Sequence, residues 1–194
     1  MQGWIGRRGA MLGAAAAAVP RRTMAQDRTW RFGPETGRIS FTARHLGLFS
    51  STGRFERFRA AVTLDPGNLG DARVEAVVET AAISHPWPAA GPLLRSAAFF
   101  DSERFPEARF AGRASGVSER GAFPVEGTLS VRGIERPFAM RARLVTRGRD
   151  QAAGRDVADF EAEGELDRTQ FAMVAERDVI SDVIALAVRV QLLL

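Results

Sequence analysis

The sequence of 194 residues contains no cysteine, no tyrosine and no lysine, and only two histidines. Without cysteine, disulfides, thiol catalysis and cysteine-ligated zinc or iron–sulfur sites are excluded, although the redox compartment stays undecided. His45 and His85 lie in separate segments and form no HxH or HxxxH pair, so we predict no metal site. Catalysis requires a base beside a nucleophile or a metal. Because the chain has so few candidate bases and nucleophiles, we predict no catalytic residue and a protein that is not an enzyme.

Excess positive charge is missing from most of the chain. The formal net charge is +4, but Arg7, Arg8, Arg21 and Arg22 lie in the first 25 residues, which contain no acidic residue, and the rest is balanced. A nucleic-acid partner requires a basic surface, which a balanced domain does not supply. We therefore predict no nucleic-acid partner.

A long apolar run is also missing. No stretch reaches the 18 or so apolar residues that a membrane-spanning helix needs. Residues 1–25 combine a basic start, the short apolar segment "AMLGAAAAAV" and "TMA" before Gln26, the pattern of a cleavable export signal. The adjacent Arg7 and Arg8 favour a twin-arginine signal, with a Sec signal or a plain basic leader as alternatives. We predict a soluble periplasmic domain over residues 26–194.

The mature region has a hydrophobic period of two, which is typical of an all-β chain. On the first long strand, Ile39, Phe41, Ala43 and His45 share one face, and a turn follows from about Gly47 to Gly53. Roughly eight such strands are expected, compatible with a sandwich or a closed antiparallel barrel. Two later strands have the same alternation. Their predicted inward residues are Phe138, Met140, Ala142 and Leu144 on one and Phe160, Ala162, Gly164 and Leu166 on the next.

Small residues at the inward positions favour the barrel. They leave space that two packed sheets would fill, and eight strands enclose room for one small ligand. Alternatively, small residues only bend the strands. The residues concerned are Ala43, Ala60, Ala76, Gly112, Ala142, Ala162 and Gly164.

The segment 84–110 interrupts the alternation. Its prolines preclude a central strand, while "GPLLRSAAFF" predicts a short helix beginning at Pro92. The aromatic residues Trp87, Phe99, Phe100 and Phe105 are too many for a solvated loop. We expect them to form a lid, a plug or a pocket entrance, or alternatively a small satellite core.

Four ordered motifs, "RISFTARHLGLFSSTGRFERF", "LLRSAAFFDSERFPEARF", "VEGTLSVRGIERPFAM" and "LDRTQFAM…VISDVIALAVRV", cover nearly all of the mature chain. Together they resemble the YceI-like family of periplasmic lipid-binding proteins. The resemblance implies an extended eight-stranded, lipocalin-like β-barrel that holds a long isoprenoid, such as a polyprenyl phosphate or a quinone, in an apolar tunnel. It implies no cofactor beyond that lipid and suggests a functional link to a cytochrome b561-type membrane protein.

The chain departs from the family at residues 90–93. An arginine–aspartate pair is usual there, whereas this chain has Ala90, Gly91, Pro92 and Leu93. We expect a more apolar entrance and, from it, a different ligand.

The ligand-binding residues that we predict are the inward apolar side chains, the aromatic pair of the insertion and His45. His45 is either a polar contact for the ligand head or bound water, or a buried structural hydrogen bond. A ligand-free stress-response or scaffolding protein and an enzyme that uses His45 remain alternatives, and a homodimer stays open. The predicted set is Phe41, His45, Phe58, Val62, Phe99, Phe100, Phe110, Leu129, Met140, Phe160 and Leu186.

Overall fold

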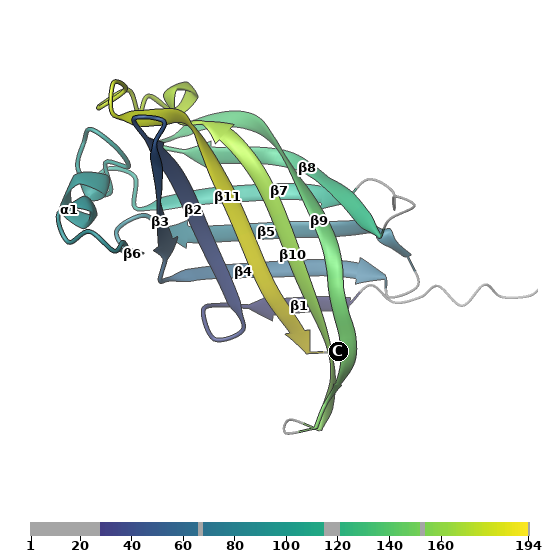
Figure 1. Cartoon of the computed structure of the whole chain (residues 1–194). Coiled ribbons are helices and arrows are strands. Elements are labelled where there is room, and N and C mark those ends of the chain that lie inside the picture. The colour runs from purple at the N-terminus through teal and green to yellow at the C-terminus, as the bar shows by residue number, and fades with distance from the viewer. Residues whose placement is uncertain (1–27, 66–67, 115–120, 152–153, 194) are drawn as a thin grey trace, which may run out of the picture.

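A computed structural model describes residues 28–65, 68–114, 121–151 and 154–193 (Figure 1). The predicted export signal lies outside these residues. The described residues form eleven strands, one short α-helix and one 3-10 helix. In chain order these are β1 (Arg28–Phe32), β2 (Gly37–His45), β3 (Phe49–Phe55), β4 (Phe58–Asp65), β5 (Asn68–Glu79), β6 (Ile83–Ser84), α1 (Ala90–Arg95), β7 (Glu107–Ala114), β8 (Ala122–Val131), β9 (Ile134–Asp150), β10 (Arg155–Asp167), η1 (Arg168–Phe171) and β11 (Ile180–Leu193).

All strands belong to one antiparallel sheet with the order β1-β4-β5-β7-β8-β9-β10-β11-β2-β3-β6. The sheet curls so strongly that β2, β9, β10 and β11 pass across β1, β4, β5 and β7 in Figure 1. The backbone N–H of Gln191 on β11 donates to the carbonyl of Thr36, just before β2, at 2.8 Å, and so extends the pairing of β11 with β2 by one residue. The predicted all-β, barrel-like fold is confirmed.

The predicted number of eight strands is wrong, because β1, β3 and β6 add to it. β6 has two residues and β1 has five, too few for a period to be recognised. β3, with the sequence FSSTGRF, carries polar residues and a glycine where the pattern of a half-buried strand expects apolar side chains.

The hairpin between β2 and β3 differs from the expected turn. The reversal occupies residues 46–48, and the N–H of Leu48 donates to the carbonyl of His45 at 2.9 Å. Gly53 is therefore not a turn residue. It lies within β3, paired with Phe41 on β2.

The expected inward faces are buried on most strands and form three apolar clusters, while arginine and glutamate side chains pair on the outside. Leu144 is an exception. Leu144 pairs with Phe160, at the last position before the register between β9 and β10 shifts, and it is 37% exposed. The bulge reverses the inside–outside alternation of β9 beyond Leu144, and a simple period of two does not reveal it.

The segment between β6 and β7 contains the predicted short helix. It begins at Ala90, two residues before the expected start, so that Pro92 lies in the first turn, where no backbone N–H is needed. Within the ranges that the structure describes, no helix is long and apolar enough to cross a membrane.

Candidate functional site

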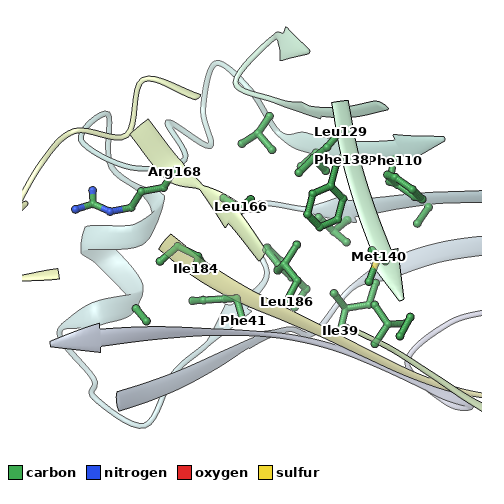
Figure 2. A pocket seen from close by; sticks show the side chains of 18 of the residues that line it. Ile39, Phe41, Phe110, Leu129, Phe138, Met140, Leu166, Arg168, Ile184 and Leu186 are labelled. Atoms are coloured by element: carbon green, nitrogen blue, oxygen red, sulfur yellow. The ribbon is translucent and has the colours of Figure 1, made fainter. Parts of the chain in front are cut away.

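The curled sheet encloses a cavity of about 500 Å³ (Figure 2). Apolar side chains from both halves of the sheet line it. Phe41, Met140 and Leu186 project into the same space from β2, β9 and β11, as Figure 2 shows. Its volume is in the range of small-molecule binding sites, which are mostly apolar with a few convergent polar groups.

The small inward residues have two different roles. The alanines at 43, 60, 76, 142 and 162 line the cavity, as the cavity interpretation predicts. The glycines instead make room for neighbouring rings. A Cβ built on Gly112 would come within 2.6 Å of the ring of Phe110, and one on Gly164 within 2.9 Å of the ring of Phe138. The free volume therefore comes from alanine.

The predicted ligand-binding residues, with one exception, line the cavity: these are Phe41, His45, Val62, Phe99, Phe100, Phe110, Leu129, Met140, Phe160 and Leu186. Their contact with a ligand stays a prediction. Phe58 is the exception, and its place in the lining needs correction. It is buried, but it packs edge-on against Phe32, with the ring centroids 6.4 Å apart, in the cluster behind Phe41 and Phe55.

Three segments form the cavity mouth. They are the β2–β3 turn, the insertion that carries α1, and residues 172–180, which run from the end of η1 to the first residue of β11. Each contributes residues next to or within the lining. Ala90 and Leu93 of the insertion line the cavity, so the entrance there is apolar, as expected from the departure at residues 90–93. Of the aromatic residues in the insertion, Trp87, Phe99 and Phe100 line the cavity, and Phe105 instead lies against Gly133.

The mouth holds a polar pair, His45 and Ser51. Their Nε2 and Oγ atoms are 2.6 Å apart, and both residues line the cavity. The His45 ring stacks on Phe49, at 5.3 Å between centroids, and lies 4.9 Å from the ring of Trp87. His45 is thus a structural hydrogen-bonding residue whose side chain also faces the cavity, and the two alternatives for it are not exclusive.

His85 is the second imidazole at the mouth. Its Nδ1 accepts a hydrogen bond from the backbone N–H of Trp87 at 3.1 Å, and its ring lies 5.4 Å from the indole. Burial lowers the pKa of His85 below its usual value. Both histidines therefore line the same end of the cavity. The sequence alone does not predict this, because they are forty residues apart, with His45 at the end of β2 and His85 in the loop after β6.

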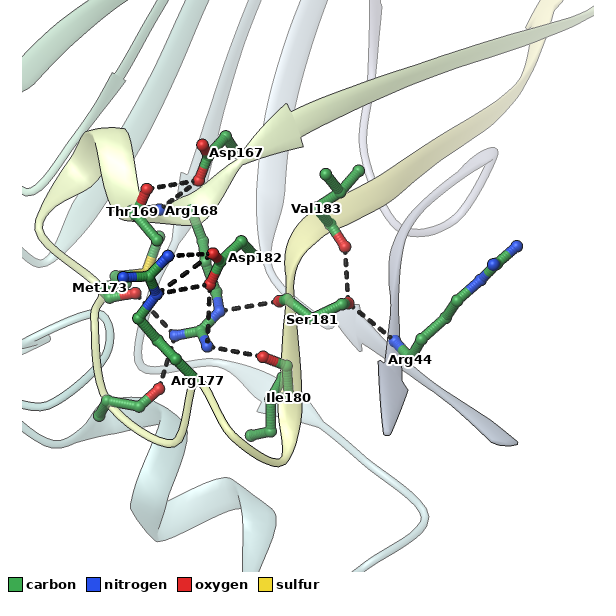
Figure 3. A network of polar contacts seen from close by, with 11 residues as sticks. Arg44, Asp167, Arg168, Thr169, Met173, Arg177, Ile180, Ser181, Asp182 and Val183 are labelled. Carbon is green, nitrogen blue, oxygen red and sulfur yellow. Dashed lines mark hydrogen bonds and ion pairs between the residues drawn. The ribbon is translucent and has the colours of Figure 1, made fainter. Parts of the chain in front are cut away.

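Arg168 is buried at the mouth with 2% of its surface exposed. Its guanidinium donates to the carbonyls of Met173, Ala175, Ile180 and Ser181 at 2.6 to 2.9 Å (Figure 3). It lies 3.8 Å from Asp182 and over the ring of Phe99, 5.7 Å from the centroid.

Burial lowers the pKa of Arg168, while Asp182 opposes that shift. Because backbone carbonyls take up its donors, Arg168 holds the 172–180 segment in place and leaves little capacity for a ligand anion. The motif "LDRTQFAM" contains this residue, but a period of two does not distinguish it from the outward arginines.

An acid–base set with His45 would draw on Ser51 and Asp101. Ser51 lies within hydrogen-bonding distance of His45, whereas Asp101 pairs with Arg104 at 3.4 Å. A nucleophile–base pair needs a third group that orients the base. In the ranges that the structure covers, no group of three or more histidine, aspartate or glutamate residues could hold a metal ion.

Comparison with known proteins gives consistent matches. A sequence model of the YceI-like domain matches residues 30–192. A UPF0312 protein of Photorhabdus laumondii is 30% identical over 139 residues, 71% of this chain and 71% of that protein. Protein YceI of Salmonella arizonae is 28% identical over 153 residues, 79% of either chain.

Solved structures have the same fold. BcnA of Burkholderia cenocepacia superposes with a TM-score of 0.71 at 14% identity, over 80% of this chain and 95% of its own. A polyisoprenoid binding domain from Saccharophagus degradans superposes with a TM-score of 0.57 at 11% identity, over 87% of this chain and 99% of its own. At these identities the likeness establishes the barrel-like fold alone.

Proposed function

Because the chain belongs to the YceI-like domain family, as its motifs predict, we propose that its cavity binds a long-chain isoprenoid or a similar amphiphilic lipid, such as a polyprenyl phosphate or a quinone. The observation that carries the proposal is a cavity of about 500 Å³ whose wall is built from apolar side chains of both halves of the sheet. One structural neighbour is described as a polyisoprenoid binding domain, which favours this ligand class.

The lining provides the affinity. Each methylene transferred from water into an apolar site contributes about 0.8 kcal/mol. The affinity for a prenyl chain therefore increases with the length of chain that the cavity shields from water. The polar head of the ligand would lie at the mouth, where His45 and Ser51 offer a hydrogen-bonding pair. The site then discriminates strongly between apolar and polar chains and only weakly between different head groups.

We propose the periplasm as the setting, because residues 1–25 have the pattern of an export signal. There the protein carries, stores or senses its lipid. A functional link to a cytochrome b561-type membrane protein and a homodimer remain predictions from the resemblance and the sequence. A ligand-free scaffold is the competing function, and an enzyme that uses His45 is a weaker one.

Native mass spectrometry followed by organic extraction tests the proposal. The expected result is a protein with one co-purified lipid of long apolar chain. Ala162 lines the cavity, so Ala162→Phe should shorten the longest chain retained without loss of stability. Ala111→Phe, on the exposed face of β7, is the matched control and should leave lipid content unchanged.

An empty cavity after gentle purification, combined with failure to take up added prenyl lipids, would overturn lipid binding. If Ala162→Phe and Ala111→Phe retain the same lipids with the same chain lengths, the assignment of this lining is overturned.

A further inference from the structure

Several of the large apolar side chains that the described chain exposes lie at the cavity mouth. Leu48 is 84% exposed, and Leu46 and Val174 are 59% exposed. Phe49, Trp87 and Val179 are also exposed at more than two fifths of their surface. We call the six residues together the apolar rim. An exposed patch of this kind marks an interaction site more often than scattered single residues do.

The rim is continuous across its three segments. The backbone N–H of Leu46 donates to the carbonyl of Val179 at 2.8 Å, which joins the β2–β3 turn to the segment before β11. The rings of Phe49 and Trp87 lie 6.0 Å apart, which joins the start of β3, directly after the turn, to the insertion. The turn and the segment before β11 lie at the same end of the barrel in Figure 1.

The rim is also continuous with the cavity. Trp87 and Val179 belong to both, since they line the cavity and are exposed to solvent. An apolar surface therefore runs from the interior to the outside without a polar belt between them at these two residues.

Leu46 is an unusual residue for its position in the turn. Leu46 and Gly47 have φ values of 50° and 68°, and a positive φ at both positions favours asparagine followed by glycine. Leu46 occupies that position at a conformational cost, and its exposure means that packing does not offset the cost. A role outside the folded chain accounts for it.

Charges of both signs lie on the segments that carry the rim. Arg44 and Arg95 are accompanied by Glu176 and Asp178, and Arg177 is paired with Asp182 at 2.5 Å. The occupant of the rim is therefore held by apolar contact and needs no net charge.

We propose that the apolar rim docks on the surface of a lipid bilayer, with the mouth of the cavity against the membrane. A bilayer fits this surface because the rim continues into a lipid-sized apolar cavity, and in that respect the inference rests on the proposed function. Docking in this orientation gives a lipid a path that avoids water. Interfacial insertion of apolar side chains is a sufficient driving force for such binding.

Flotation of the purified protein with phosphatidylcholine vesicles tests the docking. Wild type should float with the vesicles, and binding should persist at 0.5 M salt because screening acts on charges only. The double variant Leu46→Asn/Leu48→Ser should lower the vesicle partition coefficient about tenfold or more, since a buried leucine is the main contribution lost. Asparagine suits the positive φ, so the hairpin should stay folded.

The matched control is Leu144→Asn/Val145→Ser. These two residues are also exposed, but they lie on the second half of β9, away from the mouth. The control should float like wild type. Equal flotation of the rim variant and wild type, or no flotation of wild type, overturns docking. Concentration-dependent self-association that the rim variant abolishes, without vesicle binding, assigns the rim to a second copy and also overturns it.

Organic extraction of the same samples separates the two proposals. A lipid-loaded protein that does not float contradicts the docking alone. A protein that floats but takes up no lipid contradicts the binding function alone.

Discussion

The ring of Phe41 on β2 lies over Gly53 on β3, so close that a Cβ at Gly53 would be 2.4 Å from the ring Cζ. Gly53 therefore provides the space into which Phe41 packs within the cavity wall. We predict that Gly53→Ala lowers the free energy of unfolding by about 1 to 3 kcal/mol, because the ring or the strand must shift. Chemical denaturation measures this.

Gly148 is the matched control. It also lies in a strand, but a Cβ there would meet nothing within 4 Å. Gly148→Ala should leave stability unchanged or raise it slightly, because alanine restricts the unfolded chain. If the two variants unfold at the same denaturant concentration, the close approach of Phe41 and Gly53 does not matter for stability.

The same pair illustrates how much of the fold the sequence predicts. The period of two places Ile39, Phe41 and His45 on one face of β2, and all three are buried. It does not identify β3, since Gly53 interrupts the apolar face and Phe41 of the neighbouring strand fills the gap. A glycine within a strand is explained by the side chain that packs over it from the neighbouring strand. The sequence of one strand alone does not identify that neighbour.

Arg168 stabilises the mouth, and its removal should be costly. We predict that Arg168→Met lowers the free energy of unfolding by about 3 to 5 kcal/mol, because carbonyls at 173, 175, 180 and 181 lose a buried donor. Arg168→Lys should restore only part of this, since an ammonium lacks the planar set of donors. Thermal and chemical unfolding measure both.

The control for Arg168 is an exposed ion pair. Arg149 and Asp156 are 3.8 Å apart with most of both side chains in solvent. Arg149→Met should change stability by less than about 1 kcal/mol. A loss at Arg168 no larger than the loss at Arg149 would contradict the role of Arg168 as the group that holds the 172–180 segment.

The candidate site was predictable where it is apolar and less so where it is polar. Alternation identifies most of the lining, because a wall residue needs only to face inward. Ser51, His85 and Arg168 reach the mouth through a short hairpin, an insertion and a 3-10 turn, whose paths depend on tertiary packing. Phe58 shows the limit on the apolar side: it faces inward, yet Phe32 covers it.

His45 should affect the choice of ligand head and leave the binding of the chain unchanged. We predict that His45→Leu, which keeps a similar size but removes the hydrogen-bonding nitrogens, weakens the binding of a prenyl alcohol by about two- to tenfold, the value of one hydrogen bond. Binding of a hydrocarbon of the same length should not weaken. Displacement of a fluorescent apolar probe measures both affinities.

Ser50→Ala, on the exposed part of β3, is the control for His45→Leu and should change neither affinity. An equal loss for alcohol and hydrocarbon would contradict a head contact and assign His45 to structure alone. Loss of a turnover activity in the His45 variant, with affinity unchanged, would favour the enzyme alternative.

His85 makes the mouth sensitive to mild acid. Its pKa is lowered in the folded protein by burial, so below the ordinary value of about 6.5 the unfolded state binds more protons and the folded state loses stability as pH falls. The pKa values of Glu56, Glu107 and Asp182 are lowered by arginine neighbours, so their contribution is lost only below about pH 4.5. We predict that the midpoint of urea unfolding decreases from pH 7.5 to pH 5.5, and decreases less in His85→Gln. His45 is present in both proteins, so the difference isolates His85. An identical pH dependence of the two midpoints would show that protonation of His85 is not linked to folding.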